Sequence, residues 1–295
     1  MSGRVLPPAL VLSAAIFVGA SMDASIKFLA KSNHVLVVAF ARYAIGTVFS
    51  LAIWMHAGRP IVTREMWRAH GLRGFVIAGC AVTFFWSLTV LPLAEAVTLS
   101  FIYPLIVPFV AWPILGERIR VTSIIGAVIG FSGVLISIQG APSAEESPQH
   151  TLGVIAVLGS ALLFSLAMVL LRARARTDGA PIVGLMTSFV PGVIIFAPTM
   201  IFATPPNLAD WPVFMLLGAL AAGFMYLMAR AYAMAEAQQL APIHYTELVW
   251  ASVFGYVIFH ETVRAQIYVG AALIIAACLY AAWDERRLAR LKEPA

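Results

Sequence analysis

The chain has 295 residues, of which 61% are hydrophobic and 11% are charged, and its mean hydropathy is +0.92. A soluble domain carries about 25% charged residues and could not bury so much apolar surface, so the composition indicates an integral membrane protein. The formal net charge of +5 does not indicate nucleic-acid binding, because the basic residues stand mainly between apolar runs and no nucleic-acid-binding motif is present.

The apolar runs are about 20 residues long and do not alternate, which predicts transmembrane helices and an all-α fold. The first run is interpreted as an uncleaved helix rather than a signal peptide, because it contains Asp23 and Lys27 and more spans follow. Pro92 supplies the break between the third and fourth helices. In chain order we expect ten helices, over 8–29, 35–56, 71–91, 94–115, 121–139, 152–171, 181–203, 212–234, 241–260 and 265–283.

Lysines and arginines in the loops and near the ends of the spans predict the orientation. If the N-terminus is cytoplasmic, 14 of these cations fall on the inside and 3 on the outside, the latter being Lys27, Lys31 and Arg264. Arg42 and Arg230 lie within spans and are not counted. We therefore expect a multi-pass protein of the bacterial inner membrane with both termini in the cytoplasm.

Two parts of the sequence resemble each other. Ala94-Glu95-Ala96, Gly116-Glu117-Arg118 and Gly126 are matched in order by Ala235-Glu236-Ala237, His260-Glu261-Thr262 and Gly270. Ten helices then divide into a repeat over 1–140, a linker over 141–151, a second repeat over 152–285 and a basic tail over 286–295. A unit of five spans crosses the membrane an odd number of times, so its second copy is inverted, which is typical of transporters.

Gly126, Gly130 and Gly133 form an extended G-x-x-x-G pattern. Such glycines let helices approach closely. They join either the two repeats or the subunits of a homodimer.

The ordered set of motifs resembles the drug/metabolite transporter superfamily, and in particular its ten-helix EamA-type members. The resemblance covers nearly the whole chain and is carried by Asp23 to Lys27, Ala41-Arg42-Tyr43, Pro104 to Arg118, and Ala241 to Ala251 through Glu261. It implies a central site lined by both halves and the transport of amino acids, nucleoside-like compounds or drugs. The Asp23/Lys27 and Tyr245-Thr246 patterns are similar to those of S-adenosylmethionine uptake carriers, whereas other relatives export amino acids. His260 departs from the glycine that many relatives have.

Charged residues inside spans are expensive and are therefore candidate functional residues. Asp23 and Lys27 are spaced i,i+4 and can pair on one helix face, as a gate or as a structural ion pair. Arg42 needs a counter-charge, which Asp23 or Glu95 can supply, and the resemblance places this arginine at a helix-packing interface. We expect these four residues to take part in coupling or gating.

His244 and Glu247 share one face of the ninth helix, and Trp250 continues it. A buried carboxylate can carry a proton, and an organic cation can stack on a tryptophan. Tyr103 lies in the matching helix of the first repeat, and Trp86 lies well inside its span. With Tyr245 these residues are the candidate substrate-binding residues. Helix packing is the structural alternative for each.

The expected function is secondary transport of a small metabolite by alternating access, with export of an amino acid or related compound favoured and uptake or exchange of an S-adenosylmethionine-like compound as the alternative. An intramembrane metalloprotease would need H-E-x-x-H, but Arg264 stands where the second histidine belongs after His260-Glu261. A channel or a membrane scaffold are further alternatives. We expect no enzyme activity, cofactor or metal. The expected partners are a small-molecule substrate and the lipid bilayer.

Overall fold

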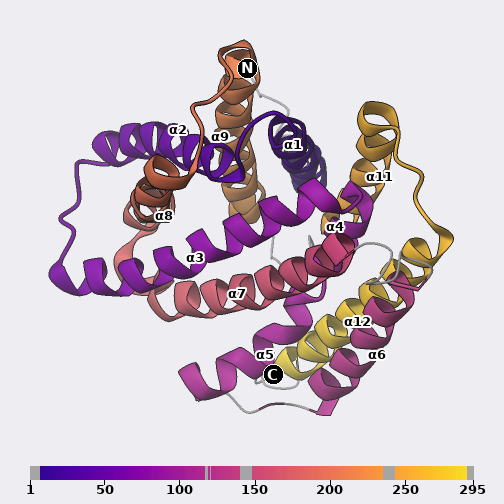
Figure 1. Cartoon of the computed structure of the whole chain (residues 1–295). Helices are drawn as coiled ribbons and strands as arrows, with labels where there is room; N and C mark the ends of the chain where they lie inside the picture. Colours follow the sequence, from indigo (N-terminus) through magenta and orange to yellow (C-terminus); the bar gives the residue numbers. More distant parts are fainter. Residues whose placement is uncertain (1–6, 117–118, 120, 140–147, 235–242, 291–295) are drawn as a thin grey trace, which may run out of the picture.

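The computed structural model describes residues 7–116, 119, 121–139, 148–234 and 243–290, and these residues form helices without any strand (Figure 1). The elements are α1 (Pro8–Leu29), α2 (Val35–His56), α3 (Arg64–Val90), α4 (Leu93–Ser100), α5 (Tyr103–Leu115), α6 (Val121–Ser137), α7 (Pro148–Asp178), α8 (Ala180–Phe202), the 3-10 turn η1 (Leu208–Asp210), α9 (Trp211–Met234), α11 (Thr246–Phe259) and α12 (Ala265–Arg290).

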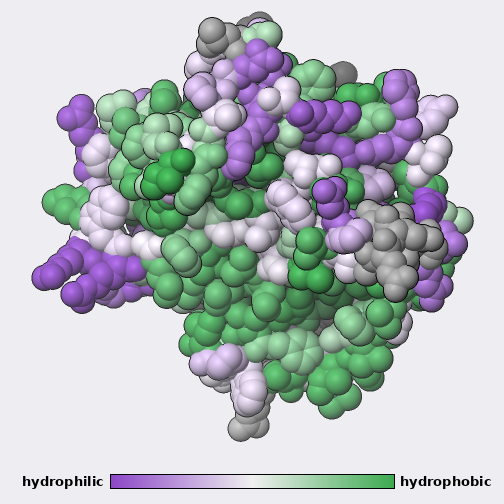
Figure 2. Space-filling model, in the orientation of Figure 1, coloured by the Kyte–Doolittle hydropathy of each residue, from purple (hydrophilic) through white to green (hydrophobic). Residues whose placement is uncertain are grey.

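The helices have the length and surface of membrane spans. Within the described ranges, seven are long and apolar enough to cross a bilayer, with α4 and α5 forming one span, and three shorter apolar helices accompany them. Large apolar side chains face outward, including Val48 at 67%, Ile201 at 72% and Phe202 at 70% exposure. Figure 2 shows apolar surface across the middle of the visible face, with hydrophilic side chains gathered toward its margins. The ten predicted spans and the all-helical membrane fold are confirmed.

Several helices are longer than the apolar runs predict. The third begins at Arg64 rather than at residue 71, because the Thr63 hydroxyl accepts a hydrogen bond from the Met66 N–H and caps its N-terminus. The helix α7 begins at Pro148, inside the predicted linker, and continues to Asp178 rather than to residue 171. Hydropathy marks only the part of a helix that lipid surrounds, so polar extensions are missed.

The connections define two ends of the bundle. The α2–α3 and α7–α8 connections lie at the end that the arginine count predicts to be cytoplasmic, which we call the basic end. The α1–α2 connection and the start of α9 lie at the opposite end. Four predicted features fall outside the described residues, namely Glu117, Ala235-Glu236-Ala237, the first two residues of the predicted ninth helix and the end of the basic tail.

Equivalent helices in the two repeats end in the same way. Gly116 terminates α5 with φ at 69°, and His260 terminates α11 with φ at 57°. Both are left-handed backbone conformations, which glycine adopts without steric cost and which histidine tolerates better than most residues. His260 therefore keeps the left-handed backbone conformation that Gly116 has in the first repeat, although it departs from the family's glycine.

The packing of the helices has the pattern expected of an inverted repeat. Counting the spans one to five in each half, α2 packs on α8 and α6 packs on α12, which are equivalent spans. The helix α3 packs on α7, and its repeat-related counterpart α9 packs on α1. In the same way, α5 packs on α7 and α11 packs on α1. The interface between the halves is therefore approximately symmetric.

Glycines bring the fifth and tenth spans together, as the extended glycine pattern predicts. A Cβ on Gly133 would lie 2.7 Å from the Gly270 carbonyl oxygen, and a Cβ on Gly270 would collide with Gly133 and Ser137. Gly130 is in similarly close contact with Leu105 of α5. Gly133 and Gly270 therefore pack the two halves of one chain together, whereas Gly130 packs within the first half, and a homodimer stays a prediction.

Candidate functional site

A charged cluster lies between α1, α2 and α11. The carboxyl groups of Asp23 and Glu247 are within hydrogen-bonding reach of each other, and the charge of Arg42 acts on Asp23. Asp23 is buried, whereas Arg42 and Glu247 are half-buried. Two of these residues come from the first repeat and one from the second. The Asp23–Arg42–Glu247 cluster thus combines residues that sequence analysis assigned separately to binding and to coupling.

The backbone of α11 favours a carboxylate at this position. The helix begins at Thr246, so Glu247 stands in its first turn. The free N–H groups of a helix N-terminus stabilise nearby negative charge. Arg42, in turn, lies over two aromatic rings, with its guanidinium carbon 4.9 Å from the Tyr43 centroid and 5.8 Å from that of Phe85. Among the described residues, the Arg42 Nε has no hydrogen-bond partner.

Aromatic side chains accompany Glu247 along α11. The Trp250 ring meets the Phe17 ring of α1 edge-on at 4.8 Å and stacks on Phe254 at 6.2 Å. Trp250 is half-buried, so part of its surface is free to contact other groups. Such rings can take the apolar part of an organic cation. Helix packing between α1 and α11 uses the same contacts.

Tyr103 and Tyr245 stand at breaks in equivalent helices. The fourth span is interrupted at Phe101 and Ile102, immediately before Tyr103, and Tyr245 interrupts the helix just before α11. The two tyrosines lie near each other, and the ring of Phe101 meets that of Tyr245 edge-on at 5.7 Å. Broken helices at corresponding places of two repeats are where transporters place substrate groups.

Trp86 and His244 are the remaining candidate substrate-binding residues. Trp86 is half-buried on α3, and no aromatic ring of the described chain stacks on it. His244 is half-buried and immediately precedes the break at Tyr245.

The predicted pairing of Lys27 with Asp23 is wrong. The Lys27 ammonium lies 2.6 Å from Glu261 Oε1 and donates a hydrogen bond to the Leu91 carbonyl oxygen. Glu261 Oε2 also accepts a hydrogen bond from the Leu93 N–H at 2.9 Å. Lys27 therefore fastens α1 to the α3–α4 junction and to the segment between α11 and α12, and Asp23 is left to Arg42 and Glu247.

Glu95 does not neutralise Arg42 either. It is fully buried, and its Oε1 lies 2.9 Å from Arg264 Nη2 and 3.2 Å from His150 Nε2. Arg264 also donates to the Gln139 carbonyl oxygen at 2.8 Å. These residues join α4 to α7 and to the segment before α12 at the opposite end of the bundle, so Glu95 holds the fold there and Asp23 is the acid near Arg42.

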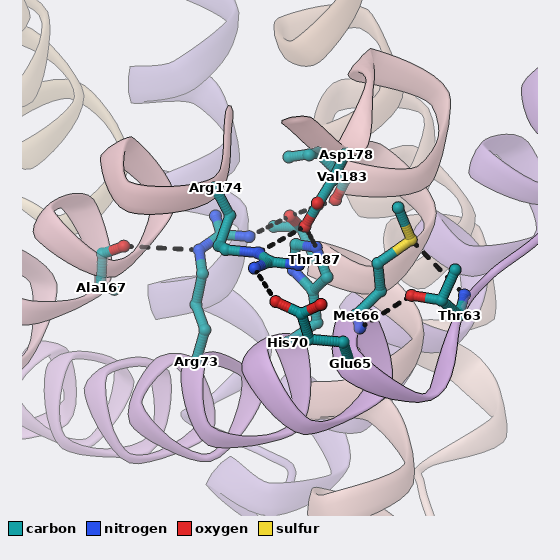
Figure 3. A network of polar contacts seen from close by, with 10 residues as sticks. All are labelled: Thr63, Glu65, Met66, His70, Arg73, Ala167, Arg174, Asp178, Val183 and Thr187. Carbon is teal, nitrogen blue, oxygen red and sulfur yellow. Dashed lines mark hydrogen bonds and ion pairs between the residues drawn. The ribbon is translucent and has the colours of Figure 1, made fainter. Parts of the chain in front are cut away.

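A polar network at the basic end was missed by sequence reasoning (Figure 3). His70 Nε2 lies 3.0 Å from Asp178 Oδ2, and both side chains are buried. Arg174 bonds to Glu65 and, through Nε at 3.2 Å, to Asp178, and these two carboxylates raise the pKa of Arg174 above its ordinary value. The signal in the sequence is a set of charged residues flanking two spans, of which only the arginines bear on the predicted topology.

Arg73, one turn further along α3, extends this network. Its Nη1 donates to the Thr187 hydroxyl of α8 at 2.8 Å, and its Nε donates to the Ala167 carbonyl oxygen of α7 at 3.4 Å. A cation that the prediction counted toward the cytoplasmic side is thus buried between the two halves. Within the described ranges, no group of three metal-ligating side chains gathers.

An inverted repeat of five membrane spans, with charged side chains from both halves meeting between broken helices, defines a membrane transporter. Residues 7–139 and residues 151–283 each match the EamA-like transporter family, and the chain belongs to this family. Its members are transporters rather than enzymes.

Curated relatives are similar over most of their length. An S-adenosylmethionine uptake transporter of Rickettsia bellii is 25% identical, covering 90% of this chain and 89% of the relative. A riboflavin transporter of Brucella anthropi is 26% identical, covering 83% and 87%, and the pseudopaline exporter CntI of Pseudomonas aeruginosa is 24% identical, covering 90% and 92%. A solved crystal structure with 19% sequence identity covers 91% of this chain and 98% of its own with a TM-score of 0.59, so it shares the fold.

Proposed function

We propose that this transporter moves a small metabolite with an amino acid group and a cationic centre across the bacterial inner membrane by alternating access. The observation that carries the proposal is the Asp23–Arg42–Glu247 cluster. Its two carboxyl groups suit an ammonium or sulfonium centre, and the Arg42 guanidinium suits a carboxylate. Trp250 supplies an aromatic face for the cation or the apolar part of the substrate.

An S-adenosylmethionine-like compound has both an amino acid group and a sulfonium centre, whereas a simple amino acid has only the amino acid group. Riboflavin, which one relative's name gives as its substrate, is uncharged and would leave the cluster without a partner. The charged cluster therefore favours S-adenosylmethionine-like compounds and amino acids over riboflavin. Export is the direction that sequence analysis favoured, with uptake or exchange as the alternative, and the names of the relatives include both directions.

The test is counterflow in proteoliposomes that contain the purified protein, with labelled S-adenosylmethionine, a panel of amino acids and riboflavin, each with and without a pH gradient. We expect exchange of a compound of the first two classes. Glu247→Gln and Asp23→Asn should each lower that exchange by about tenfold or more, because each removes a carboxylate that would bind the cationic centre, and a hydrogen bond to a charged group is worth ~1.5–3 kcal/mol. Glu247→Gln should also abolish the part of transport that a pH gradient drives.

Glu146→Gln, in the segment between the repeats, is the matched control and should exchange as the wild type does. Exchange that is unchanged in both cluster variants would leave a transporter whose substrate binds elsewhere. Exchange of riboflavin alone would overturn the charged-substrate assignment.

A further inference from the structure

The polar contacts at the two ends of the bundle join equivalent parts of the repeat. At the basic end, Asp178, which ends α7, contacts His70 near the start of α3. At the opposite end, Asn33, which follows α1, donates through Nδ2 to Asp210 Oδ2, just before α9, at 2.7 Å. Each contact thus links the first connection of one half to the beginning of the third span of the other half.

The correspondence extends to single residues. Asn33 and Asp178 are 145 positions apart in the sequence, as are Glu65 and Asp210. The first residues of α2 and α8, Val35 and Ala180, have the same separation. Asn33 and Asp210 at the opposite end are therefore equivalent to Asp178 and Glu65 at the basic end, a pair that Arg174 connects, so the same feature of the repeat is present once at each end of the molecule.

The chemistry of the two ends differs. Arg174 connects Glu65 to Asp178 at the basic end, where His70 and Asp178 have side-chain exposures of 2% and 0%. At the opposite end, the donors to Asp210 are neutral, namely the Ser32 hydroxyl at 2.6 Å and the Asn33 amide. Asn33 Oδ1 also accepts from the Asn207 N–H at 2.9 Å. We name the two sets the basic-end staple (Glu65, His70, Arg174, Asp178) and the opposite-end staple (Ser32, Asn33, Asp210).

We propose that these two staples are the alternating closures of the transporter, each of which must separate for the substrate to pass at its own end. Both staples connect one half to the other, so movement of the halves that opens an end must break the contacts there. Both are formed in this structure, which is therefore closed at the staples of both ends. This inference rests on the proposed alternating access.

The experiment measures access to the centre without any substrate, so its failure is distinguishable from failure of the proposed transport. Cys80 of α3 is half-buried and interacts electrostatically with Arg42, so its accessibility to a reagent measures access to the neighbourhood of Arg42. In a Cys278→Ser background, Cys80 is the remaining cysteine. Its labelling by a membrane-impermeant maleimide is followed in right-side-out and inverted vesicles.

Asp178→Ala breaks the basic-end staple. It should raise the rate of Cys80 labelling from the basic end by about tenfold relative to the rate from the opposite end. A tenfold change is the scale expected for the loss of a charge-assisted hydrogen bond. Asp210→Ala should have the reverse effect. Arg174→Gln, which leaves the contact between His70 and Asp178 in place, is a milder variant at the basic end if Asp178→Ala does not fold. Equal changes from both ends, or no change from either end in any variant, would overturn the proposal.

A covalent lock provides the complementary measurement. Ser32→Cys combined with Asp210→Cys replaces two side chains in direct contact, and oxidation should hold the opposite end closed. Locked protein should lose exchange and regain it on reduction, while Ser32→Cys alone and Asp210→Cys alone should be unaffected by the same oxidant. Full exchange through the locked protein would show that this staple does not open during transport.

Discussion

Replacing Lys27 by methionine should destabilise the protein by about 3–5 kcal/mol, because it leaves the Glu261 carboxylate without its counter-charge. The two charged groups lie 2.6 Å apart, with side-chain exposures of 7% and 19%. The free energy of unfolding can be measured by titrating the protein in mild-detergent micelles with sodium dodecyl sulfate and following tryptophan fluorescence.

The physical reason for this large effect is the break at Pro92. The helix α3 ends there with its Leu91 carbonyl facing the Lys27 ammonium, and α4 begins with its Leu93 N–H facing Glu261. A cation thus lies at a helix C-terminus and an anion at a helix N-terminus, and each also stabilises the other. Replacing Lys27 removes the cation at the end of α3 and leaves the Glu261 carboxylate at the start of α4 without a counter-charge.

Two further variants separate the charge from the backbone contacts. Glu261→Gln can keep an oxygen for the Leu93 N–H, so Lys27→Met combined with Glu261→Gln should be more stable than Lys27→Met alone. Lys31→Met is the control, since Lys31 is exposed and its ammonium lies 4.6 Å from the Phe259 centroid, a contact worth at most about 1 kcal/mol. Equal losses for Lys27→Met and Lys31→Met would contradict the assigned role of the ion pair.

The second large effect is expected where α6 and α12 approach each other. Gly133→Ala should cost about 1–3 kcal/mol, because the new methyl group would lie 2.7 Å from a backbone oxygen and 2.8 Å from Ile274 Cγ1, and backbone cannot rotate away as a side chain can. Gly270→Leu, which puts a larger group against the Gly133 carbonyl and Ser137, should prevent folding. Yield of monodisperse protein and the free energy of unfolding in micelles measure the two outcomes.

The matched controls are Gly159→Ala in α7 and Gly184→Ala in α8. A Cβ at either position meets no atom within 4 Å. Both substitutions should stabilise the protein by up to about 1 kcal/mol, because alanine favours a helix interior over glycine. If Gly133→Ala proved as harmless as these, the close approach of α6 and α12 would be wrong, and the glycines would have to pack against something other than the second half.

The failed prediction for Lys27 shows the limit of reasoning along one helix. Asp23 and Lys27 have the spacing of an intrahelical pair, and the sequence offered no closer alternative. Glu261 is more than two hundred positions away, and it competes successfully because it lies at the same end of the bundle and also caps α4. Only the packing of α1 against α11 and α4 could reveal that partner.

His70, Arg73 and Asp178 illustrate the same limit. Each stands near the polar end of an apolar run, where a loop or snorkelling position is the usual interpretation. The helices α3 and α7 instead continue beyond their apolar runs and pack on each other, which buries these side chains between the halves. Their role follows from helix length, which hydropathy does not measure.

The sequence by itself determined the features that depend on composition and order along the chain. Its apolar runs required ten helices in lipid, Pro92 required a break, and the repeated Glu117/Glu261 and Gly126/Gly270 spacing predicted two inverted halves. Only the tertiary structure decided which charges meet. A buried charge takes the partner that best compensates its lost hydration, and that partner is set by which helices pack together rather than by distance in the sequence.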